Sequence, residues 1–523
     1  MGGDFFMHLK KERKMAKKIL FITPPYHCGV VEAAGRWGNL GFLYIASELR
    51  KDGHEIEIYD AMAKNHTYED IEKRIKASKP DIVGSTAYTA TIHDATEVLR
   101  LAKSINPGII TLVGGIHPTM MPEDTLERGN SAIDYIVRWE GEYTTVELLK
   151  AIEGKMELSE VKGIAYRKGA EIVTTPKRDY IEDLDSLSPA WDLLDWEDYY
   201  LCYMDDSRVA IVSSSRGCCN ECAFCSQQKF WEKTYRARSP ENFVAEVEDL
   251  FNRLGVNVFF VGDEYPTYNR ERWEEILDLL IEKDLGVYFL LQTCATDIIR
   301  DRDIIHKYRA AGVIHMYLGV EAATQEALDN FKKTQTCEEC REAIALLNEQ
   351  DIITECSFIL GLPDESEQSI KNTLELAKHY NADNPHFLMI CPWPYADMYH
   401  ELEPYIEDWD YRNYNLVEPI VKPKNMTREE VLKEVLKCYK TYYMQKLPQW
   451  EELEDDFKKE LLFHGLKAIA ENSFLKKHMS NGDGGMPEAV RKYLLRPQST
   501  RIKAGKREVK VHKRTQPSTH VHP

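Results

Sequence analysis

Two long stretches of the chain alternate short apolar runs with amphipathic segments. In the first stretch the apolar runs are residues 17–26, 55–61, 81–88, 108–119 and 133–142. The short runs predict buried strands, and the helical spacing of apolar residues between them predicts helices. Strands that alternate with helices of this length form a parallel, doubly wound sheet. We therefore expect an α/β fold with a Rossmann-like domain over residues 17–150.

The same alternation returns from Val209 onward. Its apolar runs are residues 209–218, 256–266, 287–295, 314–322, 353–363 and 385–394. About six strand–helix units are too few for an eight-fold barrel, so they predict a partial (β/α)6 TIM-like barrel over residues 208–396. Ligands of such sheets bind beyond the carboxyl ends of the strands. The candidate ligand loops of the first domain are residues 24–29, 85–88, 114–119 and 140–142.

The remaining segments carry weaker patterns. Residues 151–207 are acidic, aromatic and turn-rich, which predicts a connector. Thr427 and Glu430 have the spacing of a capping box, which begins a helix within a mostly helical C-terminal domain at residues 397–495. Residues 496–523 are basic and poor in core residues, so we expect a disordered tail or an artificially added remnant.

Composition narrows the class of protein. The chain has 523 residues and a formal net charge of -19, which argues against a nucleic-acid partner because phosphate binding needs a basic surface. No apolar run reaches the roughly 18–20 residues that span a membrane. The N-terminus has no apolar signal core, so we expect a cytoplasmic protein. Twelve cysteines in so long a chain are not typical of a secreted disulfide framework.

The densest chemistry lies in "SSSRGCCNECAFCSQQKFW", residues 213–231. Cys218, Cys222 and Cys225 form C-x3-C-x2-C directly after the first predicted barrel strand. A structural zinc site, a redox pair and an iron–sulfur cluster all compete for this run. Structural zinc takes four ligands, usually in two separated pairs, and no fourth cysteine belongs to this set. Three thiolates can hold a cubane and leave one iron open, so we favour a cluster.

"RGCCNECAFCS" resembles the motif of the radical S-adenosylmethionine (SAM) superfamily, with Phe224 as its aromatic residue. The resemblance implies a [4Fe-4S] cluster on Cys218, Cys222 and Cys225 as metal ligands, with Cys219 as a neighbour. The open iron would chelate SAM, whose reductive cleavage gives a 5′-deoxyadenosyl radical. Three further segments, "VGDEYP", "LGVEAATQEALDNFKK" and "FILGLPDE", resemble the SAM-binding parts of the family. The implied SAM-binding residues are Phe224, Gly262, Asp263, Glu264, Glu321 and Gly361.

The first domain resembles the cobalamin-binding domain that one branch of this superfamily carries. The segments "GNLGFLYIASELRKDGHEIEIYDA", "VGGIHPT" and "WEGE" carry the resemblance. The implied cobalamin-binding residues are Pro25, Gly38, Asn39, Ser85, Thr86, Gly114, Gly115, His117, Pro118, Glu140 and Gly141. The Asp-x-His-x-x-Gly motif of other corrinoid proteins is absent after Asp60, so we expect no protein histidine on cobalt from that loop. The glycines at 114 and 115 suit close approach of a nucleotide tail.

The resemblance implies a cobalamin-dependent radical SAM methyltransferase that methylates an unactivated carbon by way of methylcobalamin. Archaeal relatives with this layout methylate amino-acid side chains of methyl-coenzyme M reductase, which implies a peptide or protein substrate. The resemblance is equally compatible with a small-molecule substrate. An external electron donor would reduce the cluster. Local similarity in residues 225–243 and 263–273 indicates an alternative, an activity like that of the anaerobic magnesium-protoporphyrin IX monomethyl ester cyclase. A corrinoid-binding protein with a silent barrel is a third reading, against which the complete cysteine triad argues.

Several residues also have plain structural interpretations. His117 could cap a turn, and Glu140 and Glu142 could belong to a solvated loop. Cys337 and Cys340 fit a surface helix turn better than a second cluster. Cys294, Cys356 and Cys391 near strand ends are interpreted as small buried residues, and Tyr265 and Tyr317 as packing residues. Trp231 fits a lid over the cluster as well as it fits the core.

Overall fold

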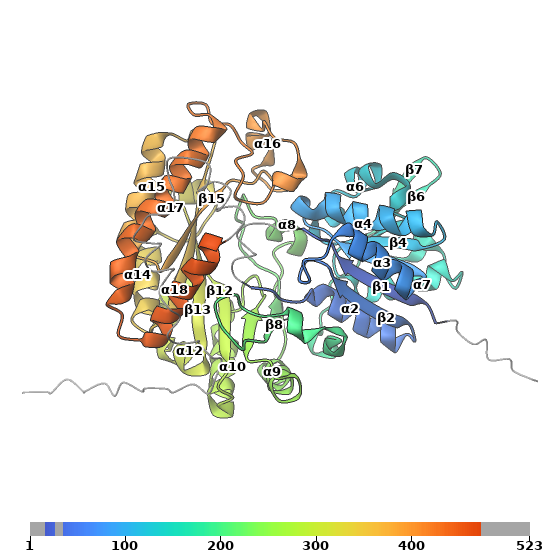
Figure 1. Cartoon of the computed structure of the whole chain (residues 1–523), viewed down its shortest axis with the longest axis horizontal. Helices are drawn as coiled ribbons and strands as arrows, with labels where there is room; N and C mark the ends of the chain where they lie inside the picture. The colour runs from blue at the N-terminus through green and yellow to red at the C-terminus, as the bar shows by residue number, and fades with distance from the viewer. Residues whose placement is uncertain (1–15, 27–34, 472–523) are drawn as a thin grey trace, which may run out of the picture.

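The computed structural model describes residues 16–26 and 35–471, which form two α/β units side by side (Figure 1). The first unit is a sheet of order β2-β1-β3-β4-β5-β6-β7. Its strands are β1 (Lys18–Thr23), β2 (Glu55–Asp60), β3 (Ile82–Thr86), β4 (Ile110–Gly114), β5 (Tyr135–Val137), β6 (Ile164–Lys168) and β7 (Glu171–Thr174). The strands β1 to β5 pair in parallel.

Helices cover both faces of this sheet. They are α2 (Leu40–Lys51), α3 (Tyr68–Ser78), α4 (Ile92–Ile105), α5 (Ile116–Met120), α6 (Pro122–Gly129) and α7 (Gly141–Ile152). Apolar residues of α3 and α4 pack in one core cluster, and those of α2 and α7 pack in another. Two cores on one sheet are the mark of a doubly wound fold, so that prediction is confirmed.

The predicted connector contributes to the first sheet, which corrects the sequence-based division of the chain. Strands β6 and β7 form an antiparallel hairpin on the edge next to β5. Gly169 at the hairpin turn has a φ of 65°, a conformation that glycine adopts without strain. Only the later part of the connector lacks strands; it contains the short 3-10 turns Leu184–Ser186, Trp191–Leu193 and Trp196–Asp198.

The second unit is an open, all-parallel sheet of order β15-β14-β13-β12-β11-β8. Its strands are β8 (Val209–Val212), β11 (Val258–Val261), β12 (Tyr288–Thr293), β13 (Val313–Glu321), β14 (Ile353–Leu360) and β15 (Asn384–Met389). The helices between them are α8 (Gln227–Trp231), α9 (Pro240–Leu254), α10 (Arg270–Lys283), α11 (Ala295–Arg300), α12 (Ile305–Ala311), α13 (Gln325–Asn330), α14 (Cys337–Asn348) and α15 (Glu367–Tyr380). A short pair, β9 (Ser215–Arg216) and β10 (Arg236–Ala237), flanks the cysteine run. The predicted partial barrel is confirmed.

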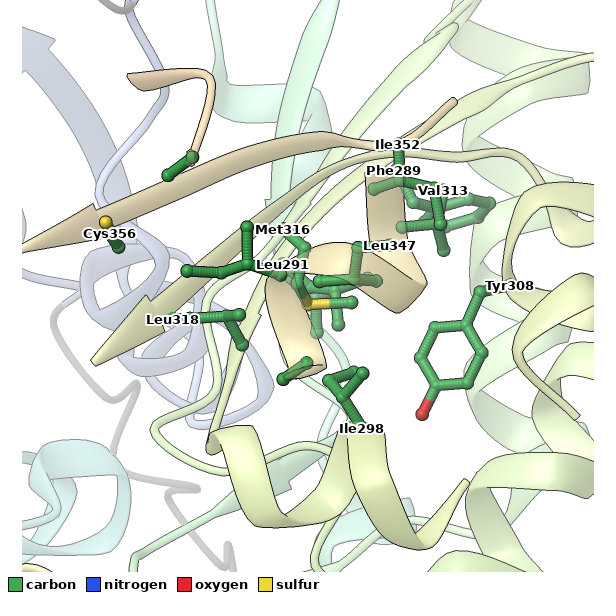
Figure 2. Packing of buried hydrophobic residues seen from close by; sticks show 14 of the residues in the cluster. Phe289, Leu291, Ile298, Tyr308, Val313, Met316, Leu318, Leu347, Ile352 and Cys356 are labelled. Carbon is green, nitrogen blue, oxygen red and sulfur yellow. The ribbon is translucent and has the colours of Figure 1, made fainter. Parts of the chain in front are cut away.

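The barrel core lies between the sheet and its outer helices. Figure 2 shows Leu291 of β12 and Met316 of β13 packed toward Leu347 of α14, with Ile298 of α11 beside them. All four side chains are nearly inaccessible to solvent. Alternate residues of the same strands point into the barrel, where polar side chains can face a ligand.

The C-terminal region contributes three helices, α16 (Tyr399–Leu402), α17 (Arg428–Glu451) and α18 (Asp456–Glu471). Helix α16 packs beside the cysteine loop, whereas the end of α17 and α18 close the barrel where its strands begin. Leu447 and Trp450 of α17 pack with Leu462 of α18 against the first residues of β8, β11 and β12. Thr427 caps α17 with Glu430 as predicted. The carboxyl ends of the strands are left for the site, while residues 472–523 lie outside the described part of the chain.

Candidate active site between the two sheets

The carboxyl ends of both sheets face one cavity of about 1430 Å³. From the first unit, the loops after β1, β3, β4 and β5 line it. From the barrel, residues after β8 and β11 line it, together with α8. Parts of the C-terminal region, including Trp393, Leu416 and His464, complete the wall. The cavity therefore connects the predicted cobalamin loops with two of the predicted SAM residues, Gly262 and Glu264. The three motif cysteines and Glu321 do not belong to its lining.

Most of the predicted cobalamin contacts lie in this wall. They are Gly38, Asn39, Ser85, Thr86, Gly114, Gly115, Glu140 and Gly141. Two of them also have structural tasks, since Asn39 accepts from the Phe42 N–H to cap α2 and the Ser85 hydroxyl donates to the Ile22 carbonyl. Among the other predicted contacts, Pro25 lies next to a wall residue, Pro24.

His117 and Pro118 are placed differently from the expectation, because α5 turns their side chains into the protein. His117 is fully buried, with its Nδ1 3.1 Å from the Thr89 hydroxyl. Its ring lies edge-on to Tyr411 of the C-terminal region at 5.1 Å between ring centres. Burial lowers the pKa of His117 despite its contact with Asp124. The structure thus places His117 between two parts of the protein and not in the cavity wall.

The glycines at the end of β4 are required because neighbouring loops pack closely against them. Gly115 has a φ of 100°, and a Cβ there would lie 2.5 Å from the Ala87 carbonyl oxygen. A Cβ on Gly114 would lie 3.3 Å from the Val137 carbonyl. Packing between neighbouring loops, in addition to ligand approach, therefore explains these residues.

The loop after β2, where the histidine motif is absent, also reaches the cavity. Met62 and Asn65 line the wall there. Asp60 is buried and accepts from the Ala63 N–H at 2.9 Å and from the Tyr199 hydroxyl at 3.3 Å. Within the described part of the chain, His464 of α18 is the one histidine in the cavity wall.

The three motif cysteines lie on a loop between β9 and α8. The Cys225 N–H donates to the Cys222 carbonyl at 3.1 Å, which folds the loop into a turn. The Gln227 N–H donates to the Cys225 sulfur at 3.4 Å, a contact that favours a thiolate. Burial raises the pKa of Cys218 to about 12 and that of Cys222 to about 11, so both thiols need a bound metal to ionise at neutral pH.

The donor set fits an iron–sulfur cluster. Three thiols gather on one loop, which Gly217, with a φ of 103°, allows to pass close to the Thr234 carbonyl. In the described residues, no three His, Cys, Asp or Glu side chains converge tightly enough for a single metal ion. A cubane requires no such convergence, because each thiolate binds a different iron. Cys219 contacts the half-exposed phenol of Tyr268 instead.

The acidic residues after β11 divide into two roles. Glu264 lines the cavity, and its carboxylate accepts from the Trp231 indole N–H at 2.8 Å. Burial raises the pKa of Glu264. Asp263 points the other way and accepts from the backbone N–H and hydroxyl of Ser214 and from the Ser215 hydroxyl. Asp263 thus fixes the loop before the cysteines, while Gly262 and Glu264 face the cavity. Trp231 lies in the cavity wall, as a lid would.

The predicted SAM residues on β13 and β14 form a second polar group. Glu321 has a φ of 63° at a bulge in β13, and it accepts from the Ser357 hydroxyl at 3.1 Å. Lys333 pairs with Glu321 at 3.3 Å and interacts electrostatically with Cys222 and Cys225. Sequence reasoning missed Lys333, although it ends the quoted motif.

The two remaining predicted SAM contacts have well-defined surroundings. Gly361 has a φ of 83°, and its N–H donates to Glu365 at 2.9 Å. The ring of Phe224 packs edge-on against Phe331, 5.2 Å away, which fixes the loop between Cys222 and Cys225. No contact with SAM is tested for either residue, so both stay predictions.

Buried ion pairs connect the first unit to the cysteine loop, and sequence analysis did not find them. Arg216, two residues before Cys218, donates to Glu140 at 2.6 Å and to Glu142 at 2.7 Å. Arg236 donates to both oxygens of Glu140 at 3.0 Å. The solvated-loop interpretation of these glutamates is wrong, because both are buried. The sequence does not show that Glu140 and Glu142 pair with Arg216 of β9 and Arg236 of β10, because these residues are brought together only by the tertiary fold.

Comparison with known proteins agrees with this architecture. The B12 binding domain family matches residues 26–149 and the radical SAM superfamily matches residues 212–377. The predicted cobalamin-type and radical SAM-type domains are confirmed. Among the described residues, no helix is both long and apolar enough to cross a membrane.

Relatives extend over most of the chain. It is 39% identical to the anaerobic magnesium-protoporphyrin IX monomethyl ester cyclase of Rubrivivax gelatinosus, over 90% of this chain and 85% of that protein. It is 30% identical to an uncharacterized methyltransferase of Pyrococcus horikoshii, over 82% of this chain and 92% of that protein. A solved structure of OxsB, with aqua-cobalamin and SAM bound, has a TM-score of 0.66 at 19% identity, over 89% of this chain and 73% of that one. The chain therefore belongs to the family of radical SAM proteins that carry an N-terminal B12 binding domain.

Proposed function

We propose that this protein is a cobalamin-dependent radical SAM methyltransferase that methylates an unactivated carbon. The observation that supports this best is the single cavity between the two sheets, lined from both units. Bound cobalamin would supply a methyl group there, and SAM on a [4Fe-4S] cluster would supply a 5′-deoxyadenosyl radical. The protein positions these groups and excludes water, since the cofactors carry the chemistry.

Each part of the site has a proposed task. Cys218, Cys222 and Cys225 hold the cluster. Glu264 follows β11 and Glu321 ends β13, and we assign them to the ammonium and ribose groups of SAM. The loops at Ser85–Thr86 and Gly114–Gly115 hold cobalamin on the facing side. Arg216 links the two sides through Glu140 and Glu142, so the distance between the cofactors is set by buried charges.

A substrate site is proposed at Tyr88. This side chain follows β3, lines the cavity and is 62% exposed within it. Its phenol interacts electrostatically with Glu264 on the opposite unit. A residue between a cobalamin loop and the barrel mouth is placed to contact whatever is methylated. Phe230, Trp231 and Trp393 also line the cavity, which favours a flat, apolar substrate.

A second candidate function is ring formation on a tetrapyrrole without methyl transfer. The 39% identity to a magnesium-protoporphyrin cyclase over most of both chains favours it. The aromatic cavity wall suits this substrate class as well.

Anaerobic turnover with methyl-labelled SAM separates the two candidates. We would supply a reductant, cobalamin and either tetrapyrroles or peptides, with the Cys218/Cys222/Cys225→Ala triple variant as the control. Methyl transfer gives 5′-deoxyadenosine together with S-adenosylhomocysteine, and label in the product. Cyclase chemistry gives 5′-deoxyadenosine alone, with oxygen from labelled water in the product. Formation of 5′-deoxyadenosine with an unlabelled product contradicts the first proposal.

A further inference from the structure

A fourth thiol, from outside the motif, lies beside the cysteine loop. Cys294 follows β12 directly and occupies the N-cap position of α11, so it lies at the barrel mouth. The Asn220 side-chain amide donates to the Cys294 sulfur at 3.4 Å. Asn220 is part of the cysteine loop, between Cys218 and Cys222. The loop is therefore folded over Cys294, which joins the three motif cysteines from a separate element.

The surroundings of Cys294 are polar, unlike those of a small core residue. Its thiol contacts the Tyr265 phenol, which itself donates to Asp297 at 2.8 Å. Lys333, which pairs with Glu321, is a further charged neighbour of the Cys294 thiol. Cys294, Cys225 and Cys222 are all electrostatic neighbours of Cys218. The Cys294 thiol therefore belongs to the same group of thiols at the barrel mouth as the three motif cysteines.

We propose that Cys294 is an exchangeable fourth ligand of the cluster, bound to the open iron until SAM displaces it. The inference rests on the cluster being held by Cys218, Cys222 and Cys225. A cubane on three thiolates leaves one iron without a protein ligand, and a thiolate is a preferred ligand of iron in such clusters. Four cysteine ligands from two elements would then complete the resting cluster.

The exchange is a ligand substitution without a change of oxidation state. Cys294 leaves the iron as its Fe–S bond breaks, and Fe–N and Fe–O bonds to the amino and carboxyl groups of SAM form. The SAM ammonium must release one proton to bind through nitrogen. The departing Cys294 thiolate accepts that proton and becomes the neutral thiol, so charge and atoms balance.

The test uses the reconstituted full-length protein without SAM. An open iron is lost on mild oxidation with ferricyanide, which leaves a three-iron cluster with a characteristic electron paramagnetic resonance. We expect the wild type to keep four irons and show little of this signal. Cys294→Ala should start with four irons, lose one, and give a strong three-iron signal that added SAM suppresses. Cys219→Ala is the matched control, a neighbouring thiol outside the ligand set, and should behave as the wild type.

A second measurement is the affinity for SAM. When a ligand must leave before SAM binds, the apparent dissociation constant equals the intrinsic one divided by the fraction of sites that are open, so it is higher. Cys294→Ala should therefore bind SAM several-fold more tightly than the wild type, and Cys219→Ala should not. Cobalamin binding by absorbance verifies that each variant is folded, and Cys294→Ser supplies a variant of nearly unchanged size.

Two outcomes overturn the inference. In one, the wild type and Cys294→Ala give equal three-iron signals and equal SAM affinities. In the other, folded Cys294→Ala fails to assemble any cluster, which would make Cys294 a permanent ligand. Neither outcome depends on methyl transfer, so this test and the turnover assay fail independently.

Discussion

At the residue scale, the surroundings of each cysteine in the run distinguish the three proposed cluster ligands from Cys219. Cys218, Cys222 and Cys225 lie on one loop, in which Cys222 and Cys225 share a turn, while Cys219 pairs with the phenol of Tyr268. Because burial disfavours the thiolates of Cys218 and Cys222, an unmetallated loop holds neutral thiols at neutral pH.

Replacing any one of Cys218, Cys222 or Cys225 with Ala should remove the cluster, because two thiolates do not hold a cubane. Cys219→Ala should keep it. Iron quantitation and electron paramagnetic resonance of the reduced protein measure this. The protein should still bind cobalamin, because the cores lie away from the loop. If Cys219→Ala lost its iron while Cys218→Ala kept four, our assignment from spacing would be wrong.

Asp60 predicts a pH dependence of stability. Burial raises its pKa from 3.8 to about 6. Between these two pKa values, Asp60 holds a proton in the folded state and has lost it in the unfolded state. The free energy of unfolding is therefore greatest below the pKa of the unfolded state and falls as pH rises through the pKa of the folded state. The loss should be about 3 kcal/mol between about pH 4 and pH 6 and level off above that. Urea unfolding of the cofactor-free wild type should show this decline relative to Asp60→Asn. Parallel pH profiles for the two proteins would contradict the prediction.

At the scale of elements, short segments from different units fix the site. The hairpin strands β9 and β10 carry Arg216 and Arg236, and the start of α7 carries Glu140 and Glu142. These four charges are nearly inaccessible to water, so removal of one leaves a partner uncompensated. The same contacts place the predicted cobalamin loop at Glu140–Gly141 against the loop that holds the cysteines.

Arg216→Ala should destabilise the docking of the two units by about 3–5 kcal/mol, because Glu142 is left buried without its cation. Limited proteolysis and thermal unfolding measure the effect. The control is Arg253→Ala, which removes an exposed pair with Asp249 in α9 and should cost about 0.5 kcal/mol or less. Equal effects of the two substitutions would show that the buried pair has no special role.

At the scale of the whole molecule, the C-terminal helices α17 and α18 seal the barrel where its strands begin, and the first unit faces the other end. The carboxyl ends of the strands of both units therefore share one cavity. Cofactor binding should stabilise the folded chain, because the unfolded chain has no such site.

Cobalamin at a hundred times its dissociation constant should raise the stability by about 2.7 kcal/mol. SAM should add a second increment in protein that carries the cluster. In the Cys218/Cys222/Cys225→Ala triple variant the cobalamin increment should remain and the SAM increment should vanish. Thermal unfolding under anaerobic conditions gives both values. Loss of the cobalamin increment in the triple variant would mean that the two sites are not separable.

The sequence alone determined the architecture and the metal-binding motif. Apolar periodicity is a local property, so it predicted the strand and helix order of both units, apart from the hairpin β6–β7, and the helix that Thr427 begins. The spacing of Cys218, Cys222 and Cys225 is equally local, because one short loop carries all three. The residues on the facing loops followed from the rule that ligands bind at the carboxyl ends of parallel strands.

Only the tertiary structure decided where individual side chains point. His117 and Asp263 lie in the predicted segments, yet they turn toward Tyr411 and Ser214 because packing between distant segments sets their direction. The sequence predicted that Cys294 is a small buried residue, whereas in the structure the loop that carries Asn220 folds over its thiol. The pairing of Arg216 with Glu142 joins residues 74 positions apart. Sequence periodicity extends over a few turns, so it carries no record of such contacts, which depend on how the two units dock.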